Sequence, residues 1–208
     1  MKNVFIYLSG TIRKSHDKDC LSEWTPTHLE TIRDLFKNEV IHPNFLNPAT
    51  RSDDLSDEFS LFGRDLLQVY LSDFVLVDMR EKRGIGVGYE IAFANFKNIP
   101  VVSWAEQHSH YRPHLCEVLG QKLTNWTHPF VSQTSQFLAG TLVEAVEFMA
   151  HSCNFNKKPI QSTDYPLRAI QHYLKTQLEK DTEMRQCIEN YKKLTETVKE
   201  ILMIPVVG

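Results

Sequence analysis

The chain has 208 residues, of which 42% are apolar and 24% are charged, a composition typical of a globular protein with one substantial core. Its net charge of −3 with neutral histidines excludes the global positive field that draws proteins to nucleic acid polymers or anionic membranes. The longest apolar runs have the length of a strand, so the sequence predicts no membrane span and no signal peptide, hence a cytoplasmic protein.

The first 150 residues alternate strand-like apolar runs with stretches of helical periodicity. Strands are predicted at Asn3–Ser9, Val40–Phe45, Phe74–Met79, Val101–Trp104 and, as the edge strand, Leu123–Trp126. Helices are predicted at 22–39, 59–71, 87–96, 115–119 and 134–150. Strands that alternate with helices through short links predict a parallel sheet with helices on both faces. We therefore expect an α/β fold of the flavodoxin-like (Rossmann-like) type with five parallel strands.

The pattern changes after residue 150. Residues 154–164 are polar and include Pro159, which indicates a linker. Residues 166–203 then carry apolar side chains at helical spacing, and Asp181 or Thr182 is placed to cap a second helix. The sequence thus predicts an α/β domain over 1–150, followed over 151–208 by a linker and a helical hairpin. The hairpin is either an oligomerisation arm or a pair of helices folded onto the chain's own core.

A turn rich in potential ligand-binding groups follows the first strand. Gly10 comes directly after the strand, where the absence of a side chain lets the backbone approach a ligand. Thr11 and Arg13 carry side chains that bind phosphate. Many strand-to-helix turns have such residues for structural reasons only, so this turn does not decide the function by itself.

A second such turn, Arg83-Gly84-Ile85-Gly86-Val87-Gly88-Tyr89-Glu90, follows the third predicted strand. Its alternate glycines expose backbone N–H groups at the start of a helix, an arrangement that suits an anion. The spacing excludes the dinucleotide-binding G-x-G-x-x-G fingerprint and the P-loop. Glu90 lies about one turn inside the helix, where it either complements the helix dipole or acts as a nucleophile in the same cleft.

Together with Arg64-Asp65 on the helix before the third predicted strand, these turns resemble the nucleoside 2-deoxyribosyltransferase superfamily. The likeness is closest to its 2′-deoxynucleoside 5′-monophosphate N-hydrolase branch. The stretch Tyr7-Leu8-Ser9-Gly10-Thr11-Ile12-Arg13 is similar to the family's opening Tyr-x-x-Gly-Ser-Ile-Arg. Residues Gly86–Glu90 repeat its Gly-Val-Gly-Tyr-Glu unchanged. The resemblance covers about residues 3 to 150.

The resemblance implies an N-glycosidase that hydrolyses a (deoxy)nucleoside 5′-monophosphate to free base and sugar phosphate. Glu90 would be the nucleophile, Tyr7 would orient it, and Asp65 would bind the sugar or assist departure of the base. The residues implied in binding the substrate and its phosphate are Gly10, Thr11, Ile12, Arg13, Gly86 and Gly88. The resemblance also implies a homodimer or larger assembly, a small-molecule nucleotide or nucleoside as partner, and no cofactor.

One position departs from the family pattern. Members of the hydrolase branch usually have a phosphate-binding serine two positions before the Gly-Val-Gly-Tyr-Glu motif, and this chain has Gly84 there, preceded by Arg83. We interpret Arg83 as a substitute contact, because a guanidinium forms charge-assisted hydrogen bonds with phosphate. The departure equally fits a substrate without a phosphate.

Three alternatives stay open. Base exchange between nucleosides uses the same Glu90 chemistry without a phosphate requirement, a non-catalytic nucleotide-binding module keeps only the fold, and cleavage of a larger nucleotide such as NAD shares the glycosidic chemistry. A metal site is not predicted, because His108, His110 and His114 lack an H-E-x-x-H frame and an evident carboxylate partner.

Overall fold

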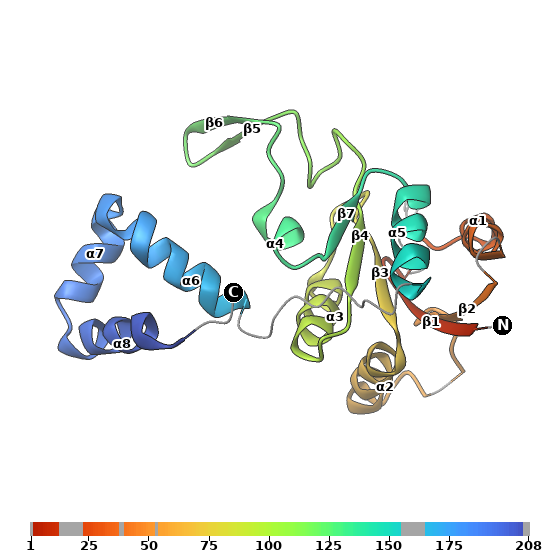
Figure 1. Cartoon of the computed structure of the whole chain (residues 1–208). Coiled ribbons are helices and arrows are strands. Elements are labelled where there is room, and N and C mark those ends of the chain that lie inside the picture. The colour runs from red at the N-terminus through yellow and green to blue at the C-terminus, as the bar shows by residue number, and fades with distance from the viewer. Residues whose placement is uncertain (1, 13–22, 38–39, 53, 155–164, 206–208) are drawn as a thin grey trace. The chain divides into compact units, whose positions relative to one another are not determined.

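The computed structural model describes residues 2–12, 23–37, 40–52, 54–154 and 165–205, and Figure 1 labels their helices and strands. The chain divides into two compact units, residues 1–160 and 161–208. Arg13, which the sequence places in a phosphate-binding turn, lies outside the described residues. Within those residues, the structure has no helix that is long and apolar enough to cross a bilayer.

The first unit is built on a five-stranded sheet in the order β2-β1-β3-β4-β7, with every neighbouring pair parallel (Figure 1). Its strands are β1 (Lys2–Ser9), β2 (Ile41–Leu46), β3 (Phe74–Asp78), β4 (Val101–Trp104) and β7 (Phe137–Ala139). The central strands β3 and β4 are buried along their whole length, as expected for parallel strands covered on both faces. The predicted flavodoxin-like α/β fold with five parallel strands is confirmed.

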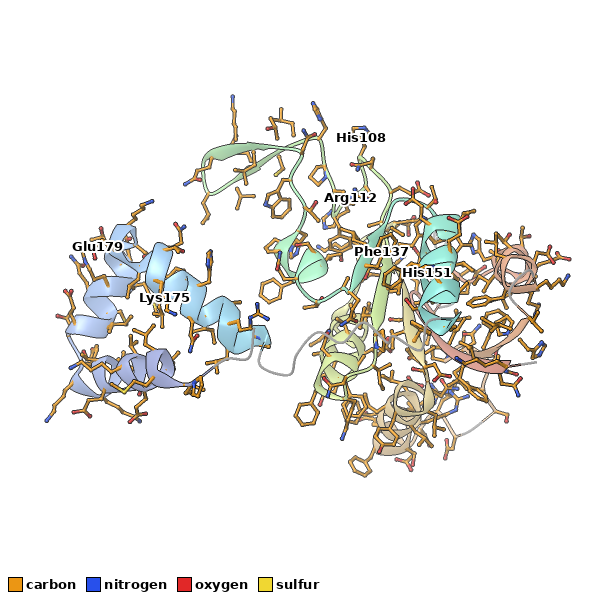
Figure 2. The ribbon with its side chains drawn as sticks, in the orientation of Figure 1. His108, Arg112, Phe137, His151, Lys175 and Glu179 are labelled. Carbon is orange, nitrogen blue, oxygen red and sulfur yellow. The ribbon has the colours of Figure 1, made fainter. Side chains whose placement is uncertain are left out.

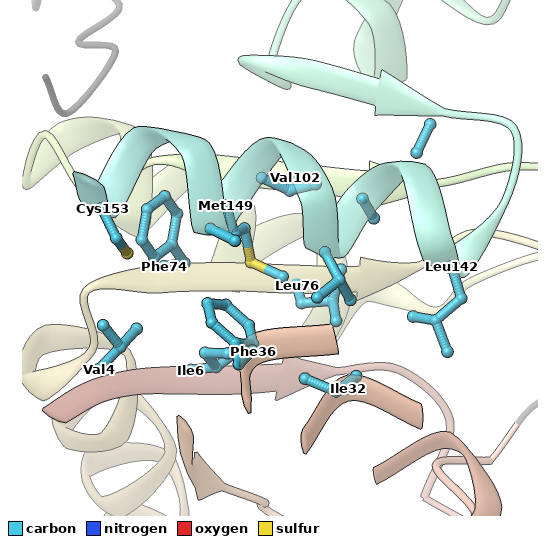
Figure 3. Packing of buried hydrophobic residues seen from close by; sticks show 14 of the residues in the cluster. Val4, Ile6, Ile32, Phe36, Phe74, Leu76, Val102, Leu142, Met149 and Cys153 are labelled. Atoms are coloured by element: carbon cyan, nitrogen blue, oxygen red, sulfur yellow. The ribbon is translucent and has the colours of Figure 1, made fainter. Parts of the chain in front are cut away.

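Two helices pack on each face of the sheet. One face holds α1 (Pro26–Lys37) and α5 (Leu142–Asn154), and the other holds α2 (Glu58–Leu71) and α3 (Ile85–Phe96). Figure 3 shows Ile6 of β1 beside Phe36 and Met149 on the α1–α5 face. Because successive side chains of a strand point to opposite faces, Tyr7 joins the other cluster, under α2 and α3. The same alternation puts Ser9 on the α3 side.

The segment between β4 and β7 corrects two predictions. Residues 115–118 form a strand (β5, Leu115–Val118), which pairs antiparallel with β6 (Gln121–Thr124) in a separate two-stranded sheet. The two-residue link between them, Leu119 and Gly120, has φ values of 50° and 78°, as a tight hairpin turn requires. The predicted helix at 115–119 and the predicted edge strand at 123–126 are therefore wrong.

The true edge strand is β7, and it occupies part of the predicted helix at 134–150. The short helix α4 (Pro129–Ser132) precedes β7, and α5 begins only at Leu142. Short apolar segments fit a strand and a buried helix equally well, and only pairing with β4 decides that residues 137–139 are a strand.

The second unit is helical. It contains α6 (Tyr165–Thr176), a 3₁₀ turn η1 (Leu178–Lys180), α7 (Thr182–Glu189) and α8 (Lys192–Met203), one helix more than the predicted hairpin. Asp181 caps α7 by accepting a hydrogen bond from the Met184 N–H at 3.0 Å, as the sequence predicts. Buried Gln171 donates to the carbonyls of Ile201 and Ile204 at 2.7 and 2.9 Å, which ties α6 to the end of α8. The apolar periodicity continues across the break between α7 and α8, so it did not reveal that break.

Candidate active site

The candidate site lies at the carboxyl ends of β1 and β3. The chain leaves β1 toward β2 on one side and returns in β3 on the other, so the strand order reverses at this point. In open α/β sheets, ligands bind beyond the strand ends at such a reversal. The turn after β1 and the turn from β3 into α3 both open here, and these are the two turns that the sequence singles out.

Glu90 is anchored at this edge by Ser9. The Ser9 hydroxyl donates to Glu90 Oε2 at 2.5 Å and joins the end of β1 to the second turn of α3. Ser9 is completely buried, whereas Glu90 is half-buried. Sequence reasoning did not assign Ser9 a role. The sequence did contain a signal for Ser9. It lies two positions after Tyr7 on the same strand, so the two side chains point to the same face of the sheet.

Tyr7 lies beside the same carboxylate. Its ring is fully buried, and its hydroxyl has no hydrogen bond of ordinary geometry among the described residues. Burial, followed by the negative charge of Glu90, raises the pKa of the Tyr7 hydroxyl far above its usual value. Tyr7 therefore stays protonated and remains a donor next to Glu90.

The environment of Glu90 shifts its acidity. Burial raises the pKa of the Glu90 carboxyl above its usual value, and the nearby Asp65 charge acts in the same direction. The hydroxyls of Ser9 and Tyr7 oppose this shift, and Ser9 has the larger effect. A carboxylate whose ionisation depends on desolvation and on named neighbours is a common feature of functional sites.

Asp65 reaches the site from α2 and is held by arginines. Arg51 lies 3.4 Å and Arg64 lies 3.5 Å from Asp65 Oδ1. Arg64 also donates to the Thr50 carbonyl at 2.8 Å and so fixes the loop before α2. The structure thus brings Tyr7, Asp65 and Glu90 within electrostatic reach of one another, from three different elements.

Arg83 is committed to groups of the protein. Its guanidinium pairs with Asp78 Oδ1 at 3.0 Å and donates to the Thr11 hydroxyl at 2.6 Å. It also donates from Nε to the Asp78 carbonyl, and its side chain is only 3% exposed. Arg83 therefore joins the turn after β1 to the end of β3, and a phosphate would have to share it with Asp78.

Asp78 is a further residue that sequence reasoning missed. It ends β3, is completely buried, and binds Arg80 through both carboxylate oxygens at 3.1 and 2.8 Å. The Arg80 guanidinium lies 4.0 Å from the centre of the Trp104 ring, a favourable cation–π contact. Two arginines on one carboxylate leave a local charge of about +1 at this end of the sheet. The sequence did contain a signal for Asp78, because it is a charged residue at the end of the apolar run of β3.

Gly10 lies in close contact with the Trp24 side chain, which favours glycine at this position. A side-chain Cβ at this position would lie 3.1 Å from Trp24 Nε1. The same nitrogen donates to the Ser9 carbonyl at 3.1 Å, so the indole closes over the turn. A small pocket beside this turn is lined by Gly10, Thr11, Ile12, Glu23, Trp24 and Asn47, among others. Three of the predicted binding residues thus surround one hollow.

The glycines at the start of α3 face open space. Gly84 is the residue before the first helical turn, and Gly86 and Gly88 lie within the first four positions. A Cβ at Gly86 or Gly88 would meet no described atom within 4 Å. Packing inside this unit therefore does not demand glycine at these two positions.

The histidine-rich connection after β4 contacts the turn that leads into α3. Tyr111 accepts a hydrogen bond from the Arg83 N–H at 2.8 Å and so fixes the turn that leads into α3. Figure 2 shows His108 and Arg112 on this connection, and the His108 N–H donates to the Arg112 carbonyl at 2.9 Å. No group of three or more potential metal ligands occurs in the part of the chain that the structure describes.

Comparison with known proteins yields a likeness of fold. No protein-family model matches the chain, and no curated protein matches it. Among solved structures, it is similar to a 2-desoxiribosyltransferase from Leishmania mexicana, with 12% sequence identity and a TM-score of 0.47. The match covers 71% of this chain and 97% of that chain. A likeness of this size concerns the fold alone.

Proposed function

We propose that the chain is an N-glycosidase that hydrolyses a (deoxy)nucleoside 5′-monophosphate, with Glu90 as its nucleophile. The observation that carries the proposal is the arrangement of Glu90 at the sheet's carboxyl edge. One oxygen of its carboxylate is held by Ser9, and Tyr7 and Asp65 lie within electrostatic reach. A glutamate that only complements the helix dipole needs none of these neighbours.

The proposed reaction has two steps. Glu90 Oε1 attacks the anomeric carbon, the carbon–nitrogen bond breaks, and its electron pair leaves with the base, which takes up a proton. A water molecule then attacks the same carbon of the glycosyl ester, releases the Glu90 carboxylate and loses one proton to solvent, while its other proton stays on the new sugar hydroxyl. Both transition states have oxocarbenium character, which a carboxylate beneath the sugar stabilises.

In this proposal, Asp65 binds a sugar hydroxyl or assists departure of the base. The turn Gly10-Thr11-Ile12 and the backbone N–H groups around Gly86 and Gly88 receive the phosphate. Three features support this placement: the hollow beside Gly10, the open space at the glycines, and the excess positive charge around Asp78.

A second candidate is base exchange between nucleosides by the same Glu90 chemistry. The observation that favours it is the engagement of Arg83 by buried Asp78, because a phosphate would have to compete with that ion pair. In this case a second base, rather than water, attacks the glycosyl ester. A homodimer or larger assembly and a cytoplasmic location remain predictions for either function.

The test is an assay of base release. The purified protein is incubated with nucleosides, their 5′-monophosphates and NAD, and free base is measured by chromatography, with and without a second base. Glu90→Gln serves as the inactive variant, and Glu147→Gln, an exposed glutamate on α5, serves as the matched control.

The expected result is release from monophosphates alone, lost in Glu90→Gln and kept in Glu147→Gln. Exchange that requires a second base would favour the transferase. Ligand binding with no base released from any compound would contradict both and indicate a sensing module.

A further inference from the structure

We propose that Ser9 is a positioning residue, whose hydroxyl fixes the carboxylate of Glu90 and leaves Oε1 as the attacking oxygen. This inference rests on the proposed function and deepens it. Its basis is the 2.5 Å hydrogen bond from Ser9 Oγ to Glu90 Oε2, which joins residues that are 81 positions apart in the chain.

Ser9 is itself held rigidly. It is the last residue of β1, it pairs with Val77 of β3, and it is completely buried. Trp24 donates to its carbonyl from the other side of the turn, at 3.1 Å. These contacts hold the Ser9 backbone in place, and from this fixed point the hydroxyl donates to Glu90. Such second-layer support is what keeps a reacting group within the narrow geometry that catalysis requires.

Few other groups can perform this task. Tyr7 faces the carboxylate from the same strand, but its hydroxyl lacks hydrogen-bond geometry in this structure. Asp65 faces it from α2, together with the arginines Arg51 and Arg64 that hold Asp65, and its negative charge opposes ionisation of Glu90. Among these neighbours, Ser9 makes the direct contact that favours the ionised carboxylate.

Substitution of Ser9 by alanine tests the inference through the pH profile. In Ser9→Ala, Glu90 loses a donor that favours its ionised form, so the acid limb of kcat/KM moves to higher pH. At the pH optimum, kcat falls about tenfold to hundredfold, the usual worth of a hydrogen bond to a charged group. We expect KM to change little, because the Ser9 side chain is completely buried and bonded to Glu90.

The matched control is Ser103→Ala. Ser103 is an equally buried serine on β4, and its hydroxyl bonds to that of Ser135 at 2.7 Å, away from Glu90. This variant loses a buried hydrogen bond of similar kind, so we expect a comparable loss of stability with the acid limb unmoved. If the acid limb of kcat/KM moved equally far in Ser9→Ala and Ser103→Ala, the positioning role of Ser9 would be overturned.

A second readout does not require activity. The side-chain carboxyl carbon of Glu90, assigned with Glu90→Gln, is titrated by ¹³C NMR in the wild type and in Ser9→Ala. We expect its midpoint to rise in Ser9→Ala. Identical titrations would overturn the inference even in an active enzyme. If the wild type releases no base, the proposed function fails, and the NMR titration still decides whether Ser9 controls Glu90.

Discussion

At the scale of the residue, the site is a balance of opposing influences on Glu90. Burial and the charge of Asp65 favour its neutral form, while the hydroxyls of Ser9 and Tyr7 favour the ionised form. The net effect is a raised pKa, so the native protein holds the Glu90 proton more tightly than the unfolded chain does. The ionised carboxylate that the proposed chemistry needs is therefore maintained at a cost in stability.

The first prediction concerns the pH dependence of that cost. The pKa of Glu90 is higher in the folded protein than in the unfolded chain. The stability that this difference contributes is therefore complete at pH values below the unfolded pKa, and it is lost as the pH rises through the folded pKa. Glu90→Gln should therefore raise the melting temperature at neutral pH, and the gain should shrink as the solution is acidified. Thermal unfolding followed by circular dichroism at several pH values measures this. Equal gains at all pH values, or the same gain in Glu147→Gln, would contradict it.

A second prediction separates structure from chemistry at Tyr7. Its hydroxyl is buried without a hydrogen bond of ordinary geometry, so Tyr7→Phe should change the free energy of unfolding by less than about 1 kcal/mol. Base release should fall at least about tenfold, because the Tyr7 hydroxyl favours the ionised form of Glu90 that the proposed reaction uses. Urea unfolding and the base-release assay are compared on the same preparation. A large loss of stability with full activity per folded molecule would assign Tyr7 to packing.

At the scale of the element, the connection from β3 to α3 is organised by a buried charge. Asp78 ends the strand, and Arg80 and Arg83 fold back onto it from the following turn. A buried carboxylate is tolerated only when it is paired and hydrogen-bonded, and these two arginines meet that need. The turn is thereby fixed, and with it the point at which α3 begins and presents Glu90.

The third prediction follows from this pairing. Asp78→Ala leaves the Arg83 guanidinium buried without its carboxylate, so the protein should lose about 3–5 kcal/mol of stability. Arg80→Ala should cost less, because the Arg80 side chain is 20% exposed and Asp78 keeps Arg83. Urea titrations of both variants provide the comparison. Equal losses of stability in the two variants would contradict the prediction, because they would mean that burial of the remaining unpaired charge does not set the loss.

At the scale of the whole molecule, the core and the candidate site belong to the first unit. Both hydrophobic clusters lie within residues 1–160. Among the described residues of the second unit, Ile188 is the single buried apolar residue. The helices of this unit line an apolar groove that includes Ile170, Leu174 and Val198. A unit of this size buries little surface and contributes a small core.

The fourth prediction is that a chain shortened to residues 1–160 folds by itself. It should unfold cooperatively in urea and keep base release within about twofold of the full chain, since every described residue of the site lies within the first unit. Sedimentation of both forms shows at the same time whether the predicted homo-oligomer depends on the second unit. Aggregation of the shortened chain, or a gradual transition without a clear midpoint, would contradict this prediction.

The sequence alone was enough to predict the sheet's central strands and to single out Glu90 as a candidate site residue. Buried parallel strands need nearly continuous apolar runs, which mark β1, β3 and β4 in the chain. Glu90 stood out because the glycine-rich turn before it, which follows such a strand, lacks a simple packing purpose, whereas Tyr7 and Asp65 were singled out by the family resemblance. These are local properties, visible in a window of a few residues.

Only the tertiary structure decided the remainder. The type of the short segments β5, β6 and β7 depends on their pairing partners, and the sequence does not contain that pairing in any local form. The contact of Ser9 with Glu90 and that of Arg83 with Thr11 join residues 81 and 72 positions apart. The energy of such contacts arises when the folded sheet brings distant strand ends together, so composition and periodicity do not identify the partner of each residue.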